Sequence, residues 1–219
     1  MAATVPSGWY DISVPLKQGM NYLPLDPVPP KIYRFNDVEL GAKVTMSMLE
    51  IISHTGTHID APLHFIPGGS TISDMPLDAT VGRARVIEIK DEEKIKVSEL
   101  KKHNIKKGER LLFKTRNSPR VYESPTFVED YVYLDGAAAE YLAEKKIRLF
   151  GLDNITIGYL KDEPNIVKTH QALLSAGIYI LEACALGNVP PGEYELLCLP
   201  LLMYKGDAGP CRAILRPLA

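Results

Sequence analysis

A short segment of the chain, HTGTHIDAPLH at residues 54–64, concentrates side chains that bind metal ions. Three of the five histidines fall within these eleven residues, together with Asp60. Neutral imidazole and carboxylate without a neighbouring thiolate form a ligand set suited to Zn, Mn or Fe(II), whereas Ca and Mg prefer oxygen alone. Zinc and manganese are the leading candidates. We therefore predict a metal centre that begins with His54, His58 and Asp60; the alternative is that these are surface or hydrogen-bonded core residues.

These ligands can meet only if the chain bends. A helix would point Asp60 away from His54 and His58, whereas an extended chain puts positions 54, 58, 60 and 64 on one side because every interval is even. Full extension would separate the first and last of these positions by ~33 Å, too far for one ion. Gly56 can take a positive φ, and Pro62 fixes a second corner. We expect a ligand loop that turns at these two residues, with the Cα atoms of His58 and Asp60 ~6.6 Å apart.

His64 lies beyond Pro62, apart from the other ligands, and we predict a catalytic role for it. An imidazole that binds no metal can move protons between water, substrate and leaving group. The alternatives are a fourth metal ligand or a histidine packed beside Phe65. The lysine-flanked His103 is expected to be an exposed residue without a role in the site.

Two residues from the second half of the chain are predicted to complete the centre. His170 is expected to open a helix over residues 169–177, and Glu182 interrupts an apolar strand over 178–186, where an unpaired carboxylate would be costly to bury. A helix that climbs ~10 Å and a strand that returns ~16 Å can bring Glu182 back to His170. A shared metal ion would offset the buried charge. The alternative for Glu182 is a salt bridge to an arginine or lysine.

The remaining pattern predicts an α/β fold with a largely β core. Prolines in the first forty residues exclude long helices there and favour short strands, with an edge strand at WYDISVPL. The apolar run 44–52 is predicted to be a strand leading into the histidine segment. Alternating or apolar patterns predict further strands at 82–90, 110–115, 147–153, 194–202 and 211–217. Helices are expected at 96–105, with Ser98 as its cap, at 136–146, and at 169–177, where Gly177 ends it.

Composition excludes several classes of protein. The chain has 219 residues, 46% of them hydrophobic and 24% charged, with a net charge of -2. That length favours a single domain over residues 1–219, and the charge gives no basic surface for nucleic acid. No apolar run is long enough to span a membrane and the N-terminus lacks a signal pattern, so we expect a cytoplasmic protein. Three widely spaced cysteines are expected to be buried thiols, with a nucleophilic cysteine as the alternative.

The segment HTGTHIDAPLH resembles the HxGTHxDxPxH signature of the cyclase-like metal-dependent hydrolases, the family of bacterial kynurenine formamidase and isatin hydrolase. The resemblance continues in WYDISVPL, THQALLSAGIYILEACAL and GDAGPCRAILRP. It implies a swivelling β/β/α fold with flanking helices, one or two divalent ions, usually zinc or manganese, and a homo-oligomer, with homodimer or homotetramer expected. It also implies that His54, His58, Asp60, His170 and Glu182 belong to the metal site and that His64 is the acid/base.

The resulting functional hypothesis is hydrolysis of an amide or lactam C–N bond in a small, aromatic or cyclic substrate. A lactonase or cyclase on the same centre, or a metal-binding domain without turnover, are the alternatives. The segments 22–27 and 151–160 differ from the corresponding segments of the formamidases. We expect both to be substrate-facing loops.

Overall fold

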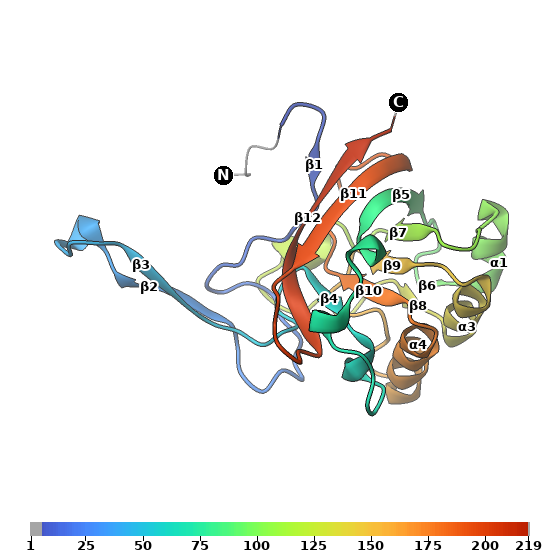
Figure 1. Cartoon of the computed structure of the whole chain (residues 1–219), viewed down its shortest axis with the longest axis horizontal. Helices are drawn as coiled ribbons and strands as arrows, with labels where there is room; N and C mark the ends of the chain where they lie inside the picture. Colours follow the sequence, from blue (N-terminus) through green and yellow to red (C-terminus); the bar gives the residue numbers. More distant parts are fainter. Residues whose placement is uncertain (1–5, 219) are drawn as a thin grey trace.

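The computed structural model describes residues 6–218. The prediction that the N-terminus carries no signal pattern concerns residues 1–5 as well, and these lie outside the described range. Its main sheet has eight strands in the order β1-β12-β11-β5-β7-β9-β10-β4 (Figure 1). The strands are β1 (Tyr10–Asp11), β4 (His58–Asp60), β5 (Val81–Glu88), β7 (Arg110–Lys114), β9 (Leu149–Leu152), β10 (Tyr179–Glu182), β11 (Gly192–Pro200) and β12 (Ala208–Pro217).

The sheet closes on itself because β12 also pairs with β4. Ala208 to Pro210 of β12 lie antiparallel to β4, and Leu215 and Ile214, farther along the same strand, pair with β1. The strands from β4 around to β12 therefore form a seven-stranded barrel, and β1 is an edge strand added to it. Closure removes the unpaired edges that an open sheet would expose.

Strands β5, β7, β9 and β10 are parallel, and helices cover their outer face (Figure 1). Leu112, Leu149 and Leu181 pack into the interior of the barrel, whereas their neighbours Phe113, Phe150 and Ile180 pack toward the helices. Burial on both faces explains why these strands read as continuous apolar runs. The helices are α1 (Val97–Leu100), α2 (Arg120–Glu123), α3 (Gly136–Lys145) and α4 (Glu163–Ser175), with 3-10 turns at Val38–Leu40, Pro62–His64, Ile72–Asp74, Leu77–Ala79 and Lys101–His103.

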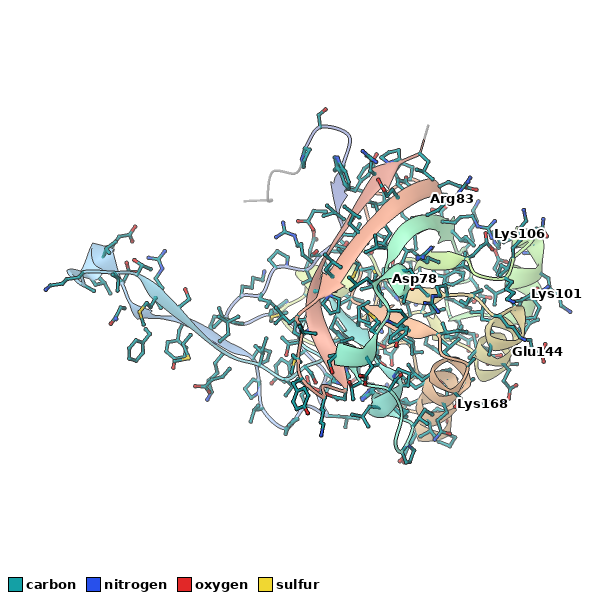
Figure 2. All side chains as sticks on the ribbon, viewed as in Figure 1. Asp78, Arg83, Lys101, Lys106, Glu144 and Lys168 are labelled. Atoms are coloured by element: carbon teal, nitrogen blue, oxygen red, sulfur yellow. The ribbon has the colours of Figure 1, made fainter. Side chains whose placement is uncertain are left out.

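Two small sheets lie outside the barrel. Strands β6 (Lys94–Ile95) and β8 (Tyr133–Leu134) form a short parallel pair near the helices. Strands β2 (Lys31–Asn36) and β3 (Met46–Glu50) form a hairpin that projects from the body on the side opposite α3 and α4 (Figure 1). Its side chains stand clear of the barrel, whereas labelled charged residues such as Arg83, Lys101 and Glu144 lie on the far side (Figure 2).

The predicted fold class is confirmed, with corrections to individual elements. The apolar run 44–52 contains the predicted strand, β3, which pairs with β2 in the exposed hairpin. Helix α4 begins at Glu163 and not at residue 169, because Asp162 accepts a hydrogen bond from the backbone N–H of Asn165 as its N-cap. Ser98 does not cap α1, since Lys96 occupies the N-cap position.

Several boundaries agree with the sequence. Gly177 follows α4 with a φ of 70°, and its N–H donates to the carbonyl of Leu174, as expected for a helix that ends in the left-handed region. The helix predicted at 136–146 is α3, and the edge strand predicted in WYDISVPL is β1. In the described part of the chain, no helix combines the length and the apolar character needed to cross a bilayer.

Candidate metal centre

The histidine segment turns at Gly56 and then joins the barrel. Gly56 has a φ of 68°, and a Cβ there would lie 2.8 Å from Leu16 Cδ2. Residues 58–60 then form β4, a short strand between β10 and β12, whose side chains are fully buried. Pro62 opens the 3-10 turn that carries His64. The bends predicted at Gly56 and Pro62 are therefore present, and the extended strand places His58 and Asp60 on one face.

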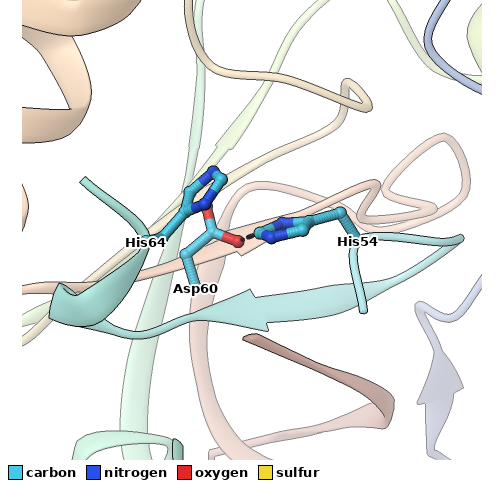
Figure 3. A group of neighbouring side chains, drawn as sticks. All are labelled: His54, Asp60 and His64. Atoms are coloured by element: carbon cyan, nitrogen blue, oxygen red, sulfur yellow. Dashed lines mark ion pairs between the residues drawn. The ribbon is translucent and has the colours of Figure 1, made fainter. Parts of the chain in front are cut away.

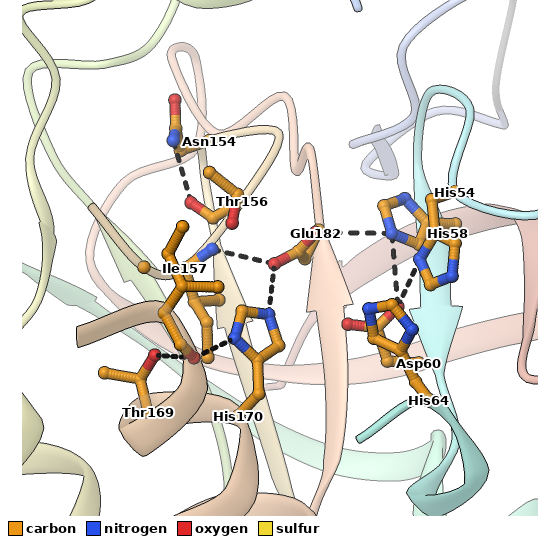
Figure 4. Close-up of polar contacts among 12 residues, drawn as sticks. His54, His58, Asp60, His64, Asn154, Thr156, Ile157, Thr169, His170 and Glu182 are labelled. Carbon is orange, nitrogen blue, oxygen red and sulfur yellow. Dashed lines mark hydrogen bonds and ion pairs between the residues drawn. The ribbon is translucent and has the colours of Figure 1, made fainter. Parts of the chain in front are cut away.

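The pairing of β4 with β10 brings Glu182 to the histidine segment. Glu182 is the direct register partner of His58, and Glu182 Oε2 lies 3.3 Å from His58 Nε2. The same nitrogen lies 3.2 Å from Asp60 Oδ1. The other oxygen of Glu182 accepts a hydrogen bond of 2.7 Å from the backbone N–H of Ile157, as Figure 4 shows. The segment 151–160 thus holds one of the predicted ligands in place.

His170 approaches Glu182 from α4. Its Nε2 lies 3.6 Å from Glu182 Oε1, and its Nδ1 donates 2.7 Å to the carbonyl of Ile166 in the same helix (Figure 4). The ring of Phe65 stacks on the His170 ring, with centroids 4.3 Å apart. The imidazole is therefore fixed by a backbone acceptor on one nitrogen and by an aromatic face.

His54 lies on the more exposed side of Asp60. His54 Nδ1 is 2.9 Å from Asp60 Oδ1, a contact drawn in Figure 3, and His54 Nε2 is 2.9 Å from Asp207 Oδ2. Asp207 immediately precedes β12, and its carbonyl accepts a hydrogen bond from the N–H of Ala61. The start of β12 therefore supplies a carboxylate to the site.

Each of three imidazoles presents one nitrogen toward the buried carboxylates and uses the other as a donor. The second nitrogen of His58 donates 2.8 Å to the carbonyl of Gly56, as that of His170 does to Ile166 and that of His54 to Asp207. An acceptor at the second nitrogen orients a metal-binding histidine and leaves the first nitrogen free to coordinate.

The donor atoms fit a divalent ion. His58 Nε2 and both carboxylate oxygens of Asp60 are buried without a hydrogen-bond partner of good geometry, an arrangement that is costly unless something compensates it. Two groups of donor atoms lie within coordinating range of one another: His54, Asp60 and His64, and His58, Asp60 and Glu182. Asp60 belongs to both groups, so the geometry accommodates one ion or two that share this carboxylate.

The protonation of the site reflects the same clustering. Burial alone would raise the pKa of Asp60, but His54 and His58 hold it well below its ordinary value. Burial likewise opposes charge on the two rings, yet Asp60 and Asp207 raise the pKa of His54 to about 9, and Asp60 with Glu182 raises that of His58. Imidazolium protons thus balance the carboxylates, and a divalent cation that binds here would replace those protons.

His64 differs from the other rings. Burial, together with the charges of His54 and His170, lowers the pKa of His64 to about 4, so the ring is neutral at pH 7. Its ring centroid lies 4.0 Å from that of His54, with the two planes tilted by 34°, and its side chain keeps 27% of its surface exposed. A neutral, partly exposed imidazole beside the centre can accept a proton. His64 also lies within coordinating range of His54 and Asp60, so the alternative that it is a metal ligand stays open.

All six residues selected from the sequence lie together, although His170 belongs to neither of the two groups of donor atoms, and their individual roles stay predictions. Two details were wrong. His170 lies in the second half of α4 and does not open it, and His103, which was expected to be exposed, is half-buried beside Glu99. Within residues 6–218, the ion-pair partners of Glu182 are His58 and His170 rather than an arginine or lysine.

Sequence reasoning missed Asp207 and assigned no role to Phe65. Asp207 occurs in GDAGP, where an acidic residue between small residues precedes a strand, and this local pattern was available as a signal. Phe65 directly follows His64, but its stacking on His170 depends on how α4 packs against the 3-10 turn. No pattern in the sequence links Phe65 with His170.

Comparison with known proteins identifies the family. Residues 10–159 match the model of the family described as "Putative cyclase". The kynurenine formamidase of Bacillus cereus (strain ATCC 10987 / NRS 248) is 37% identical over 213 residues, which cover 97% of this chain and 99% of that protein.

Solved structures agree with the fold. A structure described as a potential metal-dependent hydrolase with cyclase activity superimposes with a TM-score of 0.83 at 32% identity, covering 96% of this chain and 98% of the other. Isatin hydrolase A from Ralstonia solanacearum superimposes with a TM-score of 0.79 at 24% identity, over 96% and 92% of the two chains, and this likeness concerns the fold. The chain therefore belongs to the putative cyclase family, the group of cyclase-like metal-dependent hydrolases that its histidine segment resembles.

Proposed function

We propose that this protein is a metal-dependent hydrolase that cleaves an amide or lactam C–N bond in a small aromatic or cyclic substrate, as an arylformamidase does. The observation that carries the proposal is the sharing of Asp60 between two groups of donor atoms, with its oxygens and His58 Nε2 left without other partners. The identity of 37% to a kynurenine formamidase over nearly the whole chain supports the bond type.

The residues of the site suit this chemistry. When bound, a divalent ion makes a water-derived nucleophile available near pH 7 and polarises the carbonyl that is attacked. His54, His58, Asp60, His170 and Glu182 would hold the metal. Neighbouring groups fix the second ring nitrogen of each histidine and the second oxygen of Glu182. His64, neutral at pH 7, would take up a proton beside the centre and deliver it to the departing nitrogen.

Turnover assays test the proposal directly. The protein stripped with a chelator and then reloaded with zinc or manganese would be assayed on N-formylkynurenine, isatin and a simple lactone. We expect chelator-sensitive hydrolysis of the formamide or the lactam. Turnover of the lactone alone would favour the lactonase alternative, and inactivity of the loaded protein on all three would contradict the proposal.

We propose zinc or manganese as the bound metal, at one or two ions per chain. Three imidazoles with two buried carboxylates give the mixed nitrogen and oxygen set that these ions accept. Elemental analysis of protein purified without added metal would give both the identity and the number of ions. Predominant calcium or magnesium would contradict the assignment.

We also propose a homodimer or homotetramer, with the β2–β3 hairpin as part of the interface. Leu40 at the tip of the hairpin is 87% exposed and Phe35 is 60% exposed, although both are large and apolar. A projecting arm with such residues is typical of a surface that another subunit covers. Light scattering after size exclusion would show a smaller particle for Phe35→Glu, while Leu77→Glu, at an exposed leucine outside the hairpin, serves as the control.

Two further predictions accompany the proposal. We propose that residues 1–219 act as one hydrolase domain, because β1 near the beginning pairs with β12 near the end. A cytoplasmic location stays a prediction from the sequence.

A further inference from the structure

Asp207 is built into the metal centre from both its backbone and its side chain. Its carbonyl accepts a hydrogen bond of 2.9 Å from Ala61, and the next residue, Ala208, is the register partner of Asp60. This anchoring sets the position of the Asp207 side chain relative to β4. The carboxylate is therefore held by the same strand pair that carries a predicted metal ligand.

The carboxylate of Asp207 contacts the imidazole edge that faces away from Asp60. Asp207 Oδ2 lies 2.9 Å from His54 Nε2, and Asp207 Oδ1 accepts a hydrogen bond of 3.0 Å from the hydroxyl of Ser53. A carboxylate offers only acceptors, so the proton of a neutral His54 ring must be on Nε2. His54 Nδ1, 2.9 Å from Asp60 Oδ1, is then the nitrogen that carries a free lone pair.

His54 is held differently from the other two imidazoles. His58 and His170 donate to the backbone carbonyls of Gly56 and Ile166, which no substitution of a side chain removes. His54 donates its hydrogen bond to a charged side chain, and such a bond is stronger than one to a neutral carbonyl. It also makes the opposite ring nitrogen, Nδ1, a better metal ligand. Asp207 Oδ2 is also 3.7 Å from His64 Nδ1, so one oxygen faces both of the partly exposed rings of the site.

We infer that Asp207 is a positioning residue of the metal centre, which orients His54 so that Nδ1 coordinates the ion beside Asp60. This inference rests on the proposed metal-dependent function and adds a residue to it. Removal of the carboxylate leaves the ring free to rotate and to carry its proton on either nitrogen. Metal affinity then falls although no ligand has been removed.

Zinc affinity, measured by competition with a chromophoric chelator, tests the inference. We expect Asp207→Ala to bind zinc about 10 to 100 times more weakly than the unchanged protein. Asp207→Asn should be intermediate, because the amide oxygen still accepts the hydrogen bond but carries no charge. Asp74→Ala is the control: it removes a nearby surface carboxylate that bonds to Thr71 and to no imidazole, and its affinity should equal that of the unchanged protein.

A second readout concerns the ring itself. In nitrogen-15 NMR spectra of the zinc-loaded, unchanged protein, His54 should show a protonated Nε2 and a coordinated Nδ1. Coordination through Nε2 would overturn the inference. So would zinc affinities of Asp207→Asn and Asp207→Ala that equal that of the unchanged protein; should the alanine variant fail to fold, the asparagine variant and the spectrum decide.

The failure of the proposed function would look different. If the unchanged protein binds neither zinc nor manganese, the metal centre itself is wrong, and the role of Asp207 falls with it. If the unchanged protein binds metal and the Asp207 variants bind it equally well, only the role of Asp207 is refuted.

Discussion

Glu182 and His58 face each other as register partners across the antiparallel β10–β4 pair, with Glu182 Oε2 3.3 Å from His58 Nε2. Their positions are set by strand pairing inside a closed barrel and not by a loop. Sites built on strands keep their donor atoms at fixed separations, which favours binding of an ion with defined geometry. The contact also joins the histidine segment to the distant C-terminal half of the chain.

Glu182→Gln tests whether this carboxylate is a ligand. The amide keeps the shape of the side chain and can still accept the hydrogen bond from Ile157, but its charge is lost. Removal of a residue that only supports a ligand lowers metal affinity by at most ~100-fold, and we expect Glu182→Gln to lower zinc affinity by more than this. Glu195→Gln, at a partly exposed glutamate of β11 that pairs with Arg216 of β12, should leave the affinity unchanged. Equal affinities in the two variants would exclude Glu182 from the centre.

His64→Ala separates an acid/base from a ligand. If His64 moves protons, the variant should bind the same amount of metal, while kcat falls about 10² to 10⁴-fold. Elemental analysis and steady-state kinetics measure the two effects. His103→Ala, at a half-buried histidine beside Glu99, should change neither. Loss of metal from the His64 variant would show that the ring is a ligand.

Gly56→Ala should weaken both folding and metal binding. A left-handed conformation costs a residue with a side chain about 1–2 kcal/mol, and the new Cβ would also press on Leu16. Because the Gly56 carbonyl holds the His58 ring, displacement of this backbone should weaken zinc affinity about tenfold.

Gly68→Ala is the matched control for that substitution. Gly68 has a φ of 72°, close to that of Gly56, but a Cβ there would have no atom within 4 Å. The free energy of unfolding of Gly68→Ala should also fall by about 1–2 kcal/mol, while its zinc affinity should stay unchanged. If both variants bind zinc like the unchanged protein, the bend at Gly56 does not position the ligands.

Asp153 makes the stability of the fold depend on pH. It accepts hydrogen bonds from the backbone and hydroxyl of Thr115 and from the backbone of Ser118, yet its burial dominates and raises its pKa to about 6. The folded protein thus holds the Asp153 proton more tightly than the unfolded chain does. The favourable contribution of protonated Asp153 to the free energy of unfolding is complete below pH ~4 and is lost as the pH rises through about 6.

Asp153→Asn removes this titration. As the pH rises from 4 to 7, the free energy of unfolding of the variant should increase by on the order of 3 kcal/mol relative to that of the unchanged protein. Urea unfolding of metal-free protein measures this difference. Asp74→Asn provides a control of opposite sign, because hydrogen bonds from Thr71 lower the pKa of that exposed carboxyl. A difference between Asp153→Asn and the unchanged protein that does not vary with pH would refute the assignment.

The sequence alone determined the local part of the centre. His54, His58, Asp60 and His64 lie within eleven residues, so their proximity follows from two bends and one extended stretch, which Gly56 and Pro62 signal directly. His170 and Glu182 were also identified, because a buried carboxylate in an apolar strand requires a partner. The start of α4 and the N-cap of α1 were not, because capping depends on which neighbouring side chain reaches the backbone.

Only the tertiary structure decided how the centre closes. Asp207 lies far along the chain from His54, and nothing in GDAGP states that β12 pairs with β4 and so places that carboxylate beside the ring. The fate of the run 44–52 was undecided for a related reason: a mostly apolar run predicts a strand, but whether it joins the barrel or projects as a hairpin depends on its pairing partner. Local preferences act over a few residues, whereas strand pairing is set by the closure of the whole sheet.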